Sequence, residues 1–450
     1  MTPKRTPERS PLELFQSHFH QILNLDHPLC RLARQIRWER FDATFGACYC
    51  PDNGRPGVPI RLMVGLHYLK HTFNESDESV VERWVENPYW QYFCGFEYMQ
   101  HECPIHPTSL VKWRQRVGAE KLEMLLQETI RTAVKTKQVS PTQFQKVTID
   151  TTVQEKAIAY PTDARLYTKM LLRLVTLAKR CGLSLRQTYV RKAPRTLKQQ
   201  GRYAHARQFI RARKCARRLK TFLGRVVRDI RRKAETIDPT LDTFLERADR
   251  LLKQTRTSKD KLYSIDAPEV RCISKGKAHK RYEFGCKVSV ATSNMDNWVL
   301  GIQALPGNPY DGHTLAAAID QIERLIDHSV SDVFVDRGYR GHDYDGSAEV
   351  HLPGKHMPKI SSTMRKRKRR RSAVEPKIGH LKSDHRMNRN FLKGVAGDQI
   401  NAILAGAGAN LRKLLRGLLH ALGWLTLKHL LIRLKFALAI TKCQPISVYP

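Results

Sequence analysis

The run Val333–Val335 constrains the fold more than any other stretch, because it is a short apolar segment that ends in an acid, Asp336. Consecutive apolar and β-branched residues of this kind are typical of a strand buried on both faces. Such a strand would carry Asp336 to the edge of a sheet. A second short strand pattern follows at Ala348–Leu352. These patterns predict a sheet in the second half of the chain.

A basic run and another acid follow this predicted sheet segment. Residues 365–371 are seven consecutive Lys or Arg residues, and Glu375 lies four positions after the last of them. On a helix that advances about 100° per residue, positions 371, 375 and 382 lie within roughly 40° of one another. Arg371, Glu375 and Lys382 could therefore share one helix face. A carboxylate between two cations is either part of a surface ion pair or a metal ligand whose neighbours bind phosphates.

An acid also stands in a β-rich pattern earlier in the chain. Phe144–Val153 is rich in β-branched residues and contains Asp150. Asp150, Asp336 and Glu375 thus form a set of three acids, two in β-rich runs and the third on a predicted helix. Carboxylate oxygens of this kind suit Mg²⁺, which fills its remaining coordination positions with waters and phosphate oxygens.

The charge of the chain indicates a polyanion as partner. Its 450 residues include 79 Lys and Arg against 42 Asp and Glu, which gives a formal net charge of +37 spread along the sequence. Such a chain is expected to bind DNA or RNA with a steep salt dependence. A membrane surface is the weaker alternative. We expect no signal peptide or spanning helix, since Lys and Arg residues interrupt the most apolar stretch, Leu411–Ile440.

The first part of the chain predicts an all-helical region. Apolar residues recur there at helical spacing, and Ser76 is placed to cap one of the helices. Lys112, Arg114 and Arg116 are expected on an exposed face. This region is interpreted either as a DNA-end recognition domain or as a dimerisation or packing module, and no clean helix-turn-helix signature decides between the two.

A long helical block separates the strand pattern of Asp150 from strands that resume near Arg281. Between Arg186 and Lys233 this block holds 18 Lys or Arg residues and one acid, Asp229. A helical hairpin with an ordinary solvated face is one interpretation. Contact with nucleic acid is favoured, because a stretch so poor in acids repels itself without a polyanion.

The order of these patterns is that of a ribonuclease H-like α/β fold: a strand with the first acid, a helical insertion, two strands, a helix, a strand with the second acid, a short strand and a helix with the third. From about Gly54 to Leu422 the chain resembles the DDE transposases of bacterial insertion sequences, specifically the insertion sequence 5 family. The motifs that carry the resemblance are Ile149–Val153, Pro306–His313, Asp336–Gly341 and Arg371-x₃-Glu375-x₆-Lys382.

The resemblance implies metal-dependent cleavage of transposon ends and their transfer to target DNA. Asp150, Asp336 and Glu375 would be the catalytic residues and would hold two Mg²⁺ ions about 4 Å apart, for which Mn²⁺ can substitute. Five basic residues are expected to contact DNA: Lys368, Arg371, Lys382, Arg337 and Arg340. The expected partners are transposon-end DNA and target DNA, with a homodimer or larger assembly on DNA and with neither a membrane nor a small-molecule substrate.

Two features depart from the related signature. The related sequences have a tyrosine three residues before the arginine, and Lys368 stands there instead, so this position can still bind a phosphate but supplies no aromatic ring. Pro376 disfavours a helix that runs through Glu375 from before it. The helix could instead begin near Glu375, with Pro376 in its first turn. Arg371 would then reach the site from a loop, and only Glu375 and Lys382 would share a face.

The patterns divide the chain into five segments. They are a disordered basic tail at 1–10, an all-α N-terminal domain at 11–140, a ribonuclease H-like catalytic core at 141–162 and 265–422, a basic helical insertion at 163–264, and a helical C-terminal extension at 423–450. The ten scattered cysteines suit free thiols in a reducing cytoplasm. The expected DNA partners imply that the protein is associated with the nucleoid. The single-residue gap between Cys48 and Cys50 does not match the ligand spacing of structural zinc sites.

Two other functions fit part of this pattern. A DNA-binding protein without catalysis, derived from a transposase, would explain the charge. It would not explain three acids within a phosphate-binding groove, which weaken DNA binding unless a metal ion is present. A nuclease or resolvase of the same fold would keep the acidic site but would not join DNA strands.

Overall fold

The computed structural model describes residues 17–442, apart from residues 51, 53–56, 235, 237, 256, 275–280 and 355–360, with side chains described as far as residue 419. The predicted basic tail, residues 1–10, lies outside this part of the chain, as do residues 443–450. No helix in the described part is both long enough and apolar enough to cross a membrane.

The N-terminal part is helical, as predicted. Its helices are α1 (Phe19–Ile22), α2 (Pro28–Gln35), α3 (Trp38–Gly46), α4 (Ile60–Thr72), α5 (Asp77–Glu86), α6 (Pro88–Phe93) and α7 (Pro107–Lys135). Ser76 caps α5 as predicted: its hydroxyl accepts a hydrogen bond from the backbone N–H of Ser79 at 2.9 Å. Gly118, with a φ of 79°, interrupts α7. A left-handed conformation of this kind favours glycine, so the interruption is encoded locally.

A mixed sheet follows the N-terminal helices. Its strands are β1 (Lys146–Lys156), β2 (Arg271–Ile273), β3 (Glu283–Ser293), β4 (Val299–Leu305), β5 (Asp332–Phe334), β6 (Glu349–His351) and β7 (Arg389–Asn390). The central order is β4-β3-β1-β5-β6, with β2 beside β3 and β7 beside β1. Strands β4, β3 and β1 are antiparallel neighbours, whereas β1, β5 and β6 run parallel. Along the chain, β1, β3, β4, β5 and β6 follow one another as expected from the sequence, and β2 and β7 are additional short strands.

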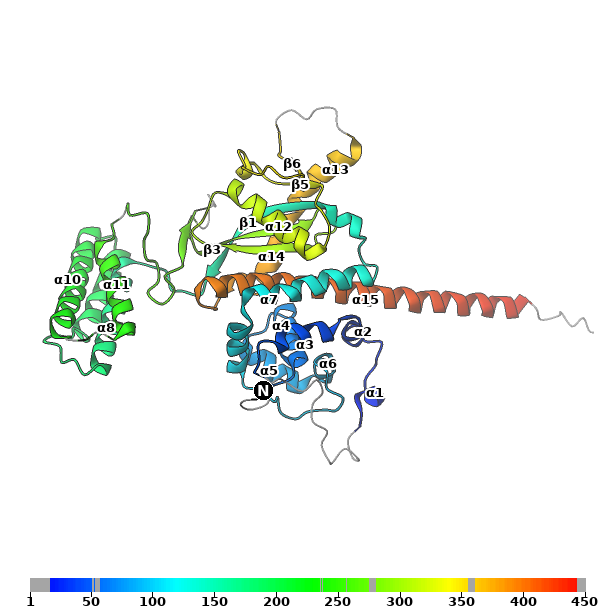
Figure 1. Ribbon diagram of the computed structural model, residues 1–450, viewed down its shortest axis with the longest axis horizontal. Helices are drawn as coiled ribbons and strands as arrows, with labels where there is room; N and C mark the ends of the chain where they lie inside the picture. Colours follow the sequence, from blue (N-terminus) through cyan, green and yellow to red (C-terminus); the bar gives the residue numbers. More distant parts are fainter. Residues whose placement is uncertain are drawn as a thin grey trace, which may run out of the picture.

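Helices cover this sheet and lie along its edge. They are α12 (Leu315–Ile326), α13 (Ser362–Arg370), α14 (Val374–Asp384) and α15 (Gly394–Lys442). Helix α15 runs beside α7 and along β4 (Figure 1). The Asn410 side chain accepts from the Val299 N–H at 2.9 Å and donates to the Val299 carbonyl at 2.8 Å. The Gln399 side chain likewise accepts from the Ala304 N–H at 2.6 Å and donates to the Ile302 carbonyl at 3.2 Å. These side-chain amides hydrogen-bond to backbone N–H and C=O groups along the edge of β4, which would otherwise be open to pairing with another chain.

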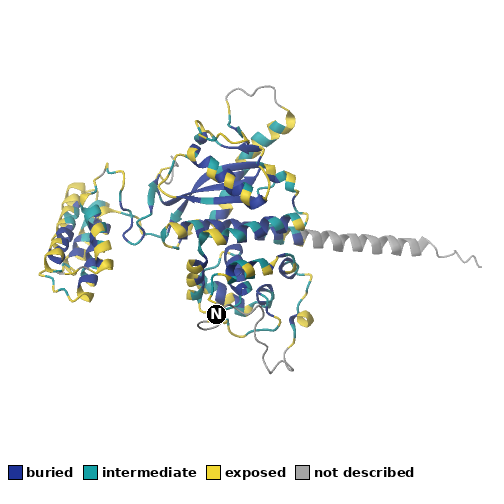
Figure 2. Cartoon of the chain, viewed as in Figure 1, coloured by how far each residue is buried: buried dark blue, intermediate teal, exposed yellow. Residues whose placement is uncertain are grey.

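Four helices form a separate bundle between β1 and β2. They are α8 (Asp163–Arg180), α9 (Lys192–His205), α10 (Phe209–Lys233) and α11 (Pro239–Lys253). The bundle stands to one side of the sheet and is connected to it through the two chain segments at its base (Figure 1). Its buried residues form their own hydrophobic cluster, which includes Leu171, Leu223 and Leu245. Its outer surface is largely exposed (Figure 2).

The N-terminal helices and the sheet share a second, larger hydrophobic cluster. It includes Leu69 on α4, Leu126 on α7, Val290 on β3 and Leu404 on α15. Helices α7 and α15 lie between the N-terminal helices and the sheet (Figure 1). The placement of the N-terminal helices relative to the sheet is therefore fixed by apolar packing.

The prediction that Arg114 is exposed is wrong. Its side chain is 2% exposed, and its guanidinium donates two hydrogen bonds to Asp77, at 2.8 and 2.7 Å. Burial alone would raise the pKa of the Asp77 carboxyl, but Arg114 and Lys70 hold that pKa well below its usual value. The helical periodicity identified a polar position on α7, but it could not show that a carboxylate on α5 faces that position. Lys112 and Arg116 are exposed as predicted.

Candidate active site

Asp150 lies near the middle of β1, in a strand that pairs on both edges. It is opposite Val290 of β3, and its carboxylate accepts a hydrogen bond from the Thr151 N–H at 2.7 Å. The neighbouring residues Thr148, Ile149 and Thr151 are buried, whereas Asp150 is half-buried. The β-branched run therefore fixes the backbone and leaves one acid accessible at the surface of the sheet.

Asp336 lies beside Asp150 because of the register between β1 and β5. These strands are parallel, with Thr148 paired to Phe334. Asp150 and Asp336 are each two residues farther along, and residues two apart in a strand point to the same face. Paired strands lie about 4.8 Å apart. Asp336 itself lies just past the end of β5, so the register brings the two predicted acids to adjacent positions where the strands separate.

The third acid, Glu375, lies in the first turn of α14 and is exposed. Helix α14 packs against β1. Asn294, in the turn after β3, fixes the approach of this segment, since its amide donates to the Thr148 hydroxyl at 3.0 Å and to the Arg367 carbonyl at 3.2 Å. Thr148 shares a strand face with Asp150, so Asn294 links α13 to the strand face that carries Asp150.

The helix restart predicted at Pro376 is confirmed. Helix α14 begins at Val374, with Pro376 in its first turn, and a 3-10 turn, η5 (Arg371–Ala373), joins α13 to α14. Arg371 therefore lies in a helical turn and not in an open loop. The Asn297 amide donates to the Ala373 carbonyl at 3.1 Å, which fixes the residue just before α14.

The five basic residues predicted to contact DNA lie on the segments that carry the acids. Lys368 is on α13, Arg371 in η5 and Lys382 on α14, and all three are half-buried. Arg337 and Arg340 lie in and directly after the 3-10 turn η4 (Arg337–Tyr339) that follows Asp336, and both are exposed.

Asp311 is an acid near this site that the sequence patterns did not identify as a site residue. It begins a short 3-10 turn, η3 (Asp311–Thr314), which contacts η4. A Cβ at Gly338 would lie 3.0 Å from Asp336 Oδ1 and 3.4 Å from Asp311 Oδ2, so these two carboxylates flank the same glycine. Lys287 on β3 pairs with Asp311 at 3.0 Å. Asp311 stands in the motif Pro306–His313, but no strand pattern pointed to its position beside Asp336.

A buried tyrosine reports the negative potential around these acids. Burial raises the pKa of Tyr339 well above its usual value, and the carboxylates of Asp311, Asp150 and Asp336 raise it further. Tyr339 is fully buried in the main hydrophobic cluster directly beneath the acids. The main hydrophobic cluster therefore extends, through Tyr339, to the neighbourhood of these carboxylates.

Another cluster of possible metal ligands lies on β5 and β6. The ligand atoms of Asp332, Glu349 and His351 all lie within 4.8 Å of one another. Lys146 pairs with Asp332 at 2.9 Å, and His351 Nε2 lies 2.8 Å from the same carboxylate. Asp150, Asp336 and Glu375 do not form a cluster this tight among the described residues. The Asp332 cluster links three neighbouring strands.

Two parts of the chain match known transposase domain families. Residues 17–116 match the family described as transposase domain (DUF772), and residues 257–411 match the family described as transposase DDE domain. The chain belongs to the insertion-sequence DDE transposase family. The DDE match implies a ribonuclease H-like core in this transposase, in agreement with its strand order. It also spans the positions of Asp336 and Glu375.

The transposase is also similar to a protein from Rhizobium meliloti described as uncharacterized protein ORF8 in the nfe locus. The two are 52% identical over 209 residues, which cover 46% of this chain and all of that protein. No solved structure matches the chain.

Proposed function

We propose that this transposase cleaves the ends of an insertion sequence and joins them to target DNA by phosphoryl transfer with two divalent metal ions. The observation that supports the proposal is the register of β1 and β5, which brings the position of Asp336 next to that of Asp150, together with the packing of α14 against β1. Glu375 in the first turn of α14 would be the third acid. Membership of the insertion sequence 5 family is compatible with the two domain matches.

The residues of this site fit divalent ions of the Mg²⁺ type. Asp150, Asp336 and Glu375 offer only carboxylate oxygens, which Mg²⁺ and Mn²⁺ prefer to nitrogen or sulfur ligands. Bound ions of this type would activate a water or a DNA 3′-hydroxyl as nucleophile and stabilise the leaving oxygen. The carboxylates must be ionised to bind them, so their affinity for the metal should fall in acid.

The basic residues around the acids would hold the reacting DNA strands. Arg371 and Lys382 lie on the same helical segment as Glu375, and Arg337 and Arg340 follow Asp336. Charge-assisted contacts from such side chains to phosphates would hold the scissile bond and the nucleophile in line. Lys368 is a further phosphate contact in this proposal.

Other parts of the chain have proposed roles that rest on the same reaction. We assign end recognition or dimerisation to residues 11–140, catalysis to 141–162 and 265–422, and DNA contact to the insertion at 163–264. The active form would be a homodimer or larger assembly at the nucleoid.

Asp150→Asn, Asp336→Asn and Glu375→Gln test this proposal. Each change keeps the side-chain volume and removes a charge, and each should lower Mg²⁺-dependent cleavage of a plasmid that carries the element by about 1,000-fold or more. DNA binding measured without metal should be at least as strong as that of wild type, because each change removes a negative charge from the phosphate-binding groove. Asp345→Asn, a change of an exposed acid nine positions after Asp336, is the matched control and should retain cleavage. Normal cleavage by any of the three variants would remove that residue from the site.

A further inference from the structure

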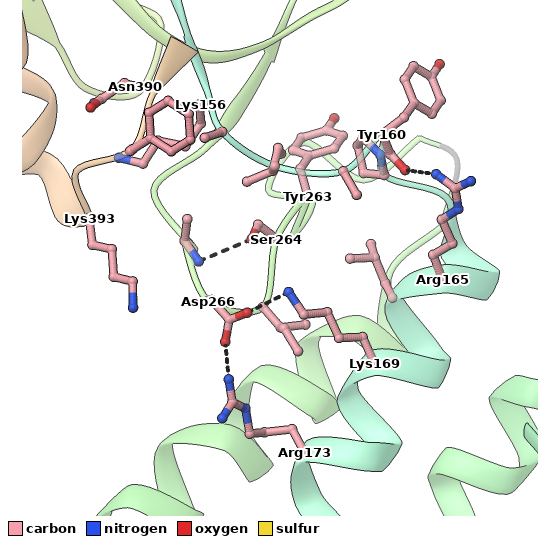
Figure 3. Close-up of a pocket in the computed structure, with 18 residues that line it drawn as sticks. Lys156, Tyr160, Arg165, Lys169, Arg173, Tyr263, Ser264, Asp266, Asn390 and Lys393 are labelled. Carbon is pink, nitrogen blue, oxygen red and sulfur yellow. Dashed lines mark hydrogen bonds and ion pairs between the residues drawn. The ribbon is translucent and has the colours of Figure 1, made fainter. Parts of the chain in front are cut away.

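A cavity of about 330 Å³ lies at the base of the insertion, away from the candidate active site (Figure 3). Three segments form its walls: the end of β1 with the start of α8, the segment 263–267 that leaves the insertion, and residues 390–393 before α15. Its volume is at the lower end of the range of about 300–1,000 Å³ that small-molecule sites occupy. The cavity is therefore large enough to hold a ligand of modest size.

The walls of this cavity combine aromatic rings with cations. Tyr160 and Phe391 are 60% and 62% exposed, and Tyr263 lines the cavity beside them. Tyr160 and Tyr263 both contact the ring of Phe284, with centroids 5.4 Å apart in each case. The two tyrosine rings are thus supported from behind by the sheet, and the rings of Tyr160 and Phe391 keep a surface open to solvent.

The cations of the cavity differ in how far they are already neutralised. Lys169 and Arg173 pair with Asp266 at 2.6 and 3.0 Å (Figure 3). The Arg165 guanidinium donates only to the Tyr160 carbonyl, at 3.3 Å, and neither Arg165 nor Lys393 has a carboxylate partner among the described residues. An anionic ligand would therefore find two cations whose charge is not already balanced.

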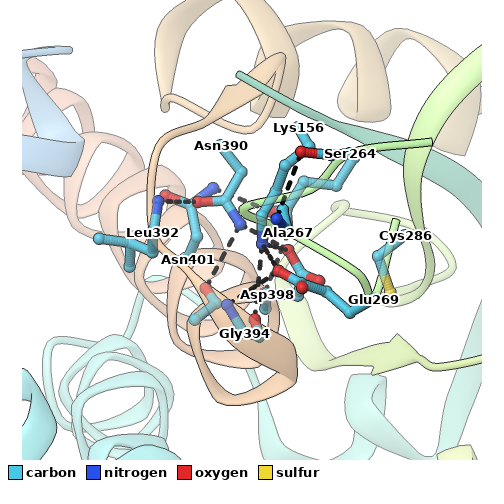
Figure 4. A network of polar contacts seen from close by, with 12 residues as sticks. Lys156, Ser264, Ala267, Glu269, Cys286, Asn390, Leu392, Gly394, Asp398 and Asn401 are labelled. Atoms are coloured by element: carbon cyan, nitrogen blue, oxygen red, sulfur yellow. Dashed lines mark hydrogen bonds and ion pairs between the residues drawn. The ribbon is translucent and has the colours of Figure 1, made fainter. Parts of the chain in front are cut away.

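A buried network holds the floor of the cavity in place (Figure 4). The Lys156 ammonium, at the end of β1, pairs with Asp398 at 2.8 Å and with Glu269 at 2.9 Å. Asn390 donates to the same Asp398 carboxylate at 2.7 Å, and Glu269 accepts from the Gly394 N–H at 2.8 Å. These contacts join the strand that leads into the insertion, the segment that leaves it and α15. The cavity is therefore formed by fixed elements before any ligand arrives.

We propose that this cavity binds a short unpaired stretch of DNA, with bases stacked on Tyr160 at one end and on Phe391 at the other and with phosphates held by Arg165 and Lys393. The proposal rests on the proposed function for the identity of the polymer. Duplex backbone alone would require only cations, whereas a base can reach an aromatic ring only after it leaves the duplex stack. Stacking of bases on exposed aromatic side chains is the usual basis of single-strand binding.

The cavity lies at a defined distance from the acids. Lys156 is six residues beyond Asp150 on the same strand, and a strand rises about 3.3 Å per residue, which gives about 20 Å. A DNA strand advances about 3.4 Å per nucleotide. An unpaired nucleotide in the cavity would therefore lie about six nucleotides from a phosphate held at Asp150.

Binding of the full-length chain to two fluorescent DNA probes in EDTA tests the proposal. One probe is a duplex of arbitrary sequence, and the other is the same duplex with a short thymine bulge. Wild type should bind the bulged probe about fivefold more tightly or better, since one stacked base contributes at least that factor. Tyr160→Ala and Phe391→Ala should each lose most of this preference and keep their affinity for the perfect duplex. Tyr160→Phe, which keeps the ring, should keep the preference.

Phe391→Leu covers the case in which an alanine variant does not fold, because it keeps apolar volume and removes the ring. Equal affinity of wild type for the two probes would overturn the proposal, and so would full bulge preference in Phe391→Leu or in both alanine variants. The measurement needs no catalysis. Bulge preference in a chain that does not cleave DNA would contradict the proposed function alone, and cleavage by a chain without that preference would contradict the cavity proposal alone.

Discussion

Asp336 has two possible roles that act through the same carboxylate. Its Oδ1 accepts the Gly338 N–H at 2.8 Å and so caps the short turn η4, while its position beside Asp150 suits metal binding. Aspartates that follow strands often serve only as caps, so the cap alone is no evidence for catalysis. The two roles differ in one respect, since a cap needs an oxygen and a metal ligand needs a negative charge.

Substitutions at Asp336 can therefore separate capping from catalysis. Asp336→Asn keeps an acceptor for Gly338 and should leave the thermal stability close to that of wild type, whereas Asp336→Ala should cost about 1 kcal/mol because the cap is removed. Both should abolish cleavage if the charge binds metal. Thermal unfolding and plasmid cleavage of the two variants provide the measurement. Cleavage by Asp336→Asn would show that Asp336 is only a cap.

The sequence patterns led to Asp150 and Asp336 as candidate site residues but not to the acid that lies near Asp336 in the structure. Asp150 and Asp336 could be proposed because each stands in a β-rich run, and a strand period is a local property. Asp311 could not be proposed in the same way. It reaches Asp336 through a contact between η3 and η4, and its partner Lys287 comes from a third strand. Such contacts depend on which elements pack together, which local periodicity does not encode.

At the scale of elements, α14 is tied to the N-terminal helices as well as to the sheet. His385, directly after α14, contacts the His71 carbonyl of α4 through Nδ1 at 2.8 Å, and Asn74 donates to the Ser383 carbonyl at 3.2 Å. The helix that carries Glu375 is therefore held at its far end by the N-terminal region. Displacement of that region would be expected to move α14.

This contact predicts a pH dependence of stability. Burial, together with the positive charges of Lys377 and Arg412, lowers the pKa of His385 to about 4 despite the opposing effect of its hydrogen bond to His71. A histidine in the unfolded chain titrates near 6.5, so the contribution of neutral His385 is complete above about pH 6.5 and is lost as the pH falls towards 4. Between pH 7.5 and 5 the stability should fall by about 2 kcal/mol through this residue.

His385→Gln keeps a donor for His71 but does not titrate. Its stability should fall less than that of wild type between these two pH values, as measured by chemical denaturation. An identical fall in both proteins would mean that His385 is not held neutral in the folded state. Other buried histidines, such as His67, titrate in both proteins and cancel in the comparison.

The predicted contact between the insertion and DNA rests on the positive charge of the insertion. Arg213, Lys214 and Arg217 are exposed on α10, and α10 contains no acid other than Asp229. Changing the three to Gln should weaken DNA binding and lower the slope of log K against log[salt] by about 0.9 for each phosphate that is no longer neutralised. Arg213→Lys with Arg217→Lys keeps the charge and should keep the slope. An unchanged slope in the Gln variant would show that these three residues form an ordinary solvated surface and do not contact DNA.

At the scale of the whole molecule, hydrophobic clusters divide the chain differently from sequence composition. The change from helical to β-rich patterns near residue 140 predicts a boundary, but the N-terminal helices share one cluster with the sheet through α7 and α15. The four insertion helices have a cluster of their own. Helical periodicity identified α7 and α15, but it could not show that the apolar faces of both would lie between two regions distant in sequence.

The most direct test of the account is whether the purified full-length chain joins the 3′ end of its own element to a target plasmid in Mg²⁺ or Mn²⁺. In the proposed function, a site that holds two ions would serve water first and the freed 3′-hydroxyl second, and the basic surfaces of the insertion and of residues 365–371 would hold the two DNA molecules. The account predicts joined products that disappear in Asp150→Asn. Cleavage without joining would indicate a nuclease of the same fold, and tight binding without either reaction in both metals would contradict a catalytic role.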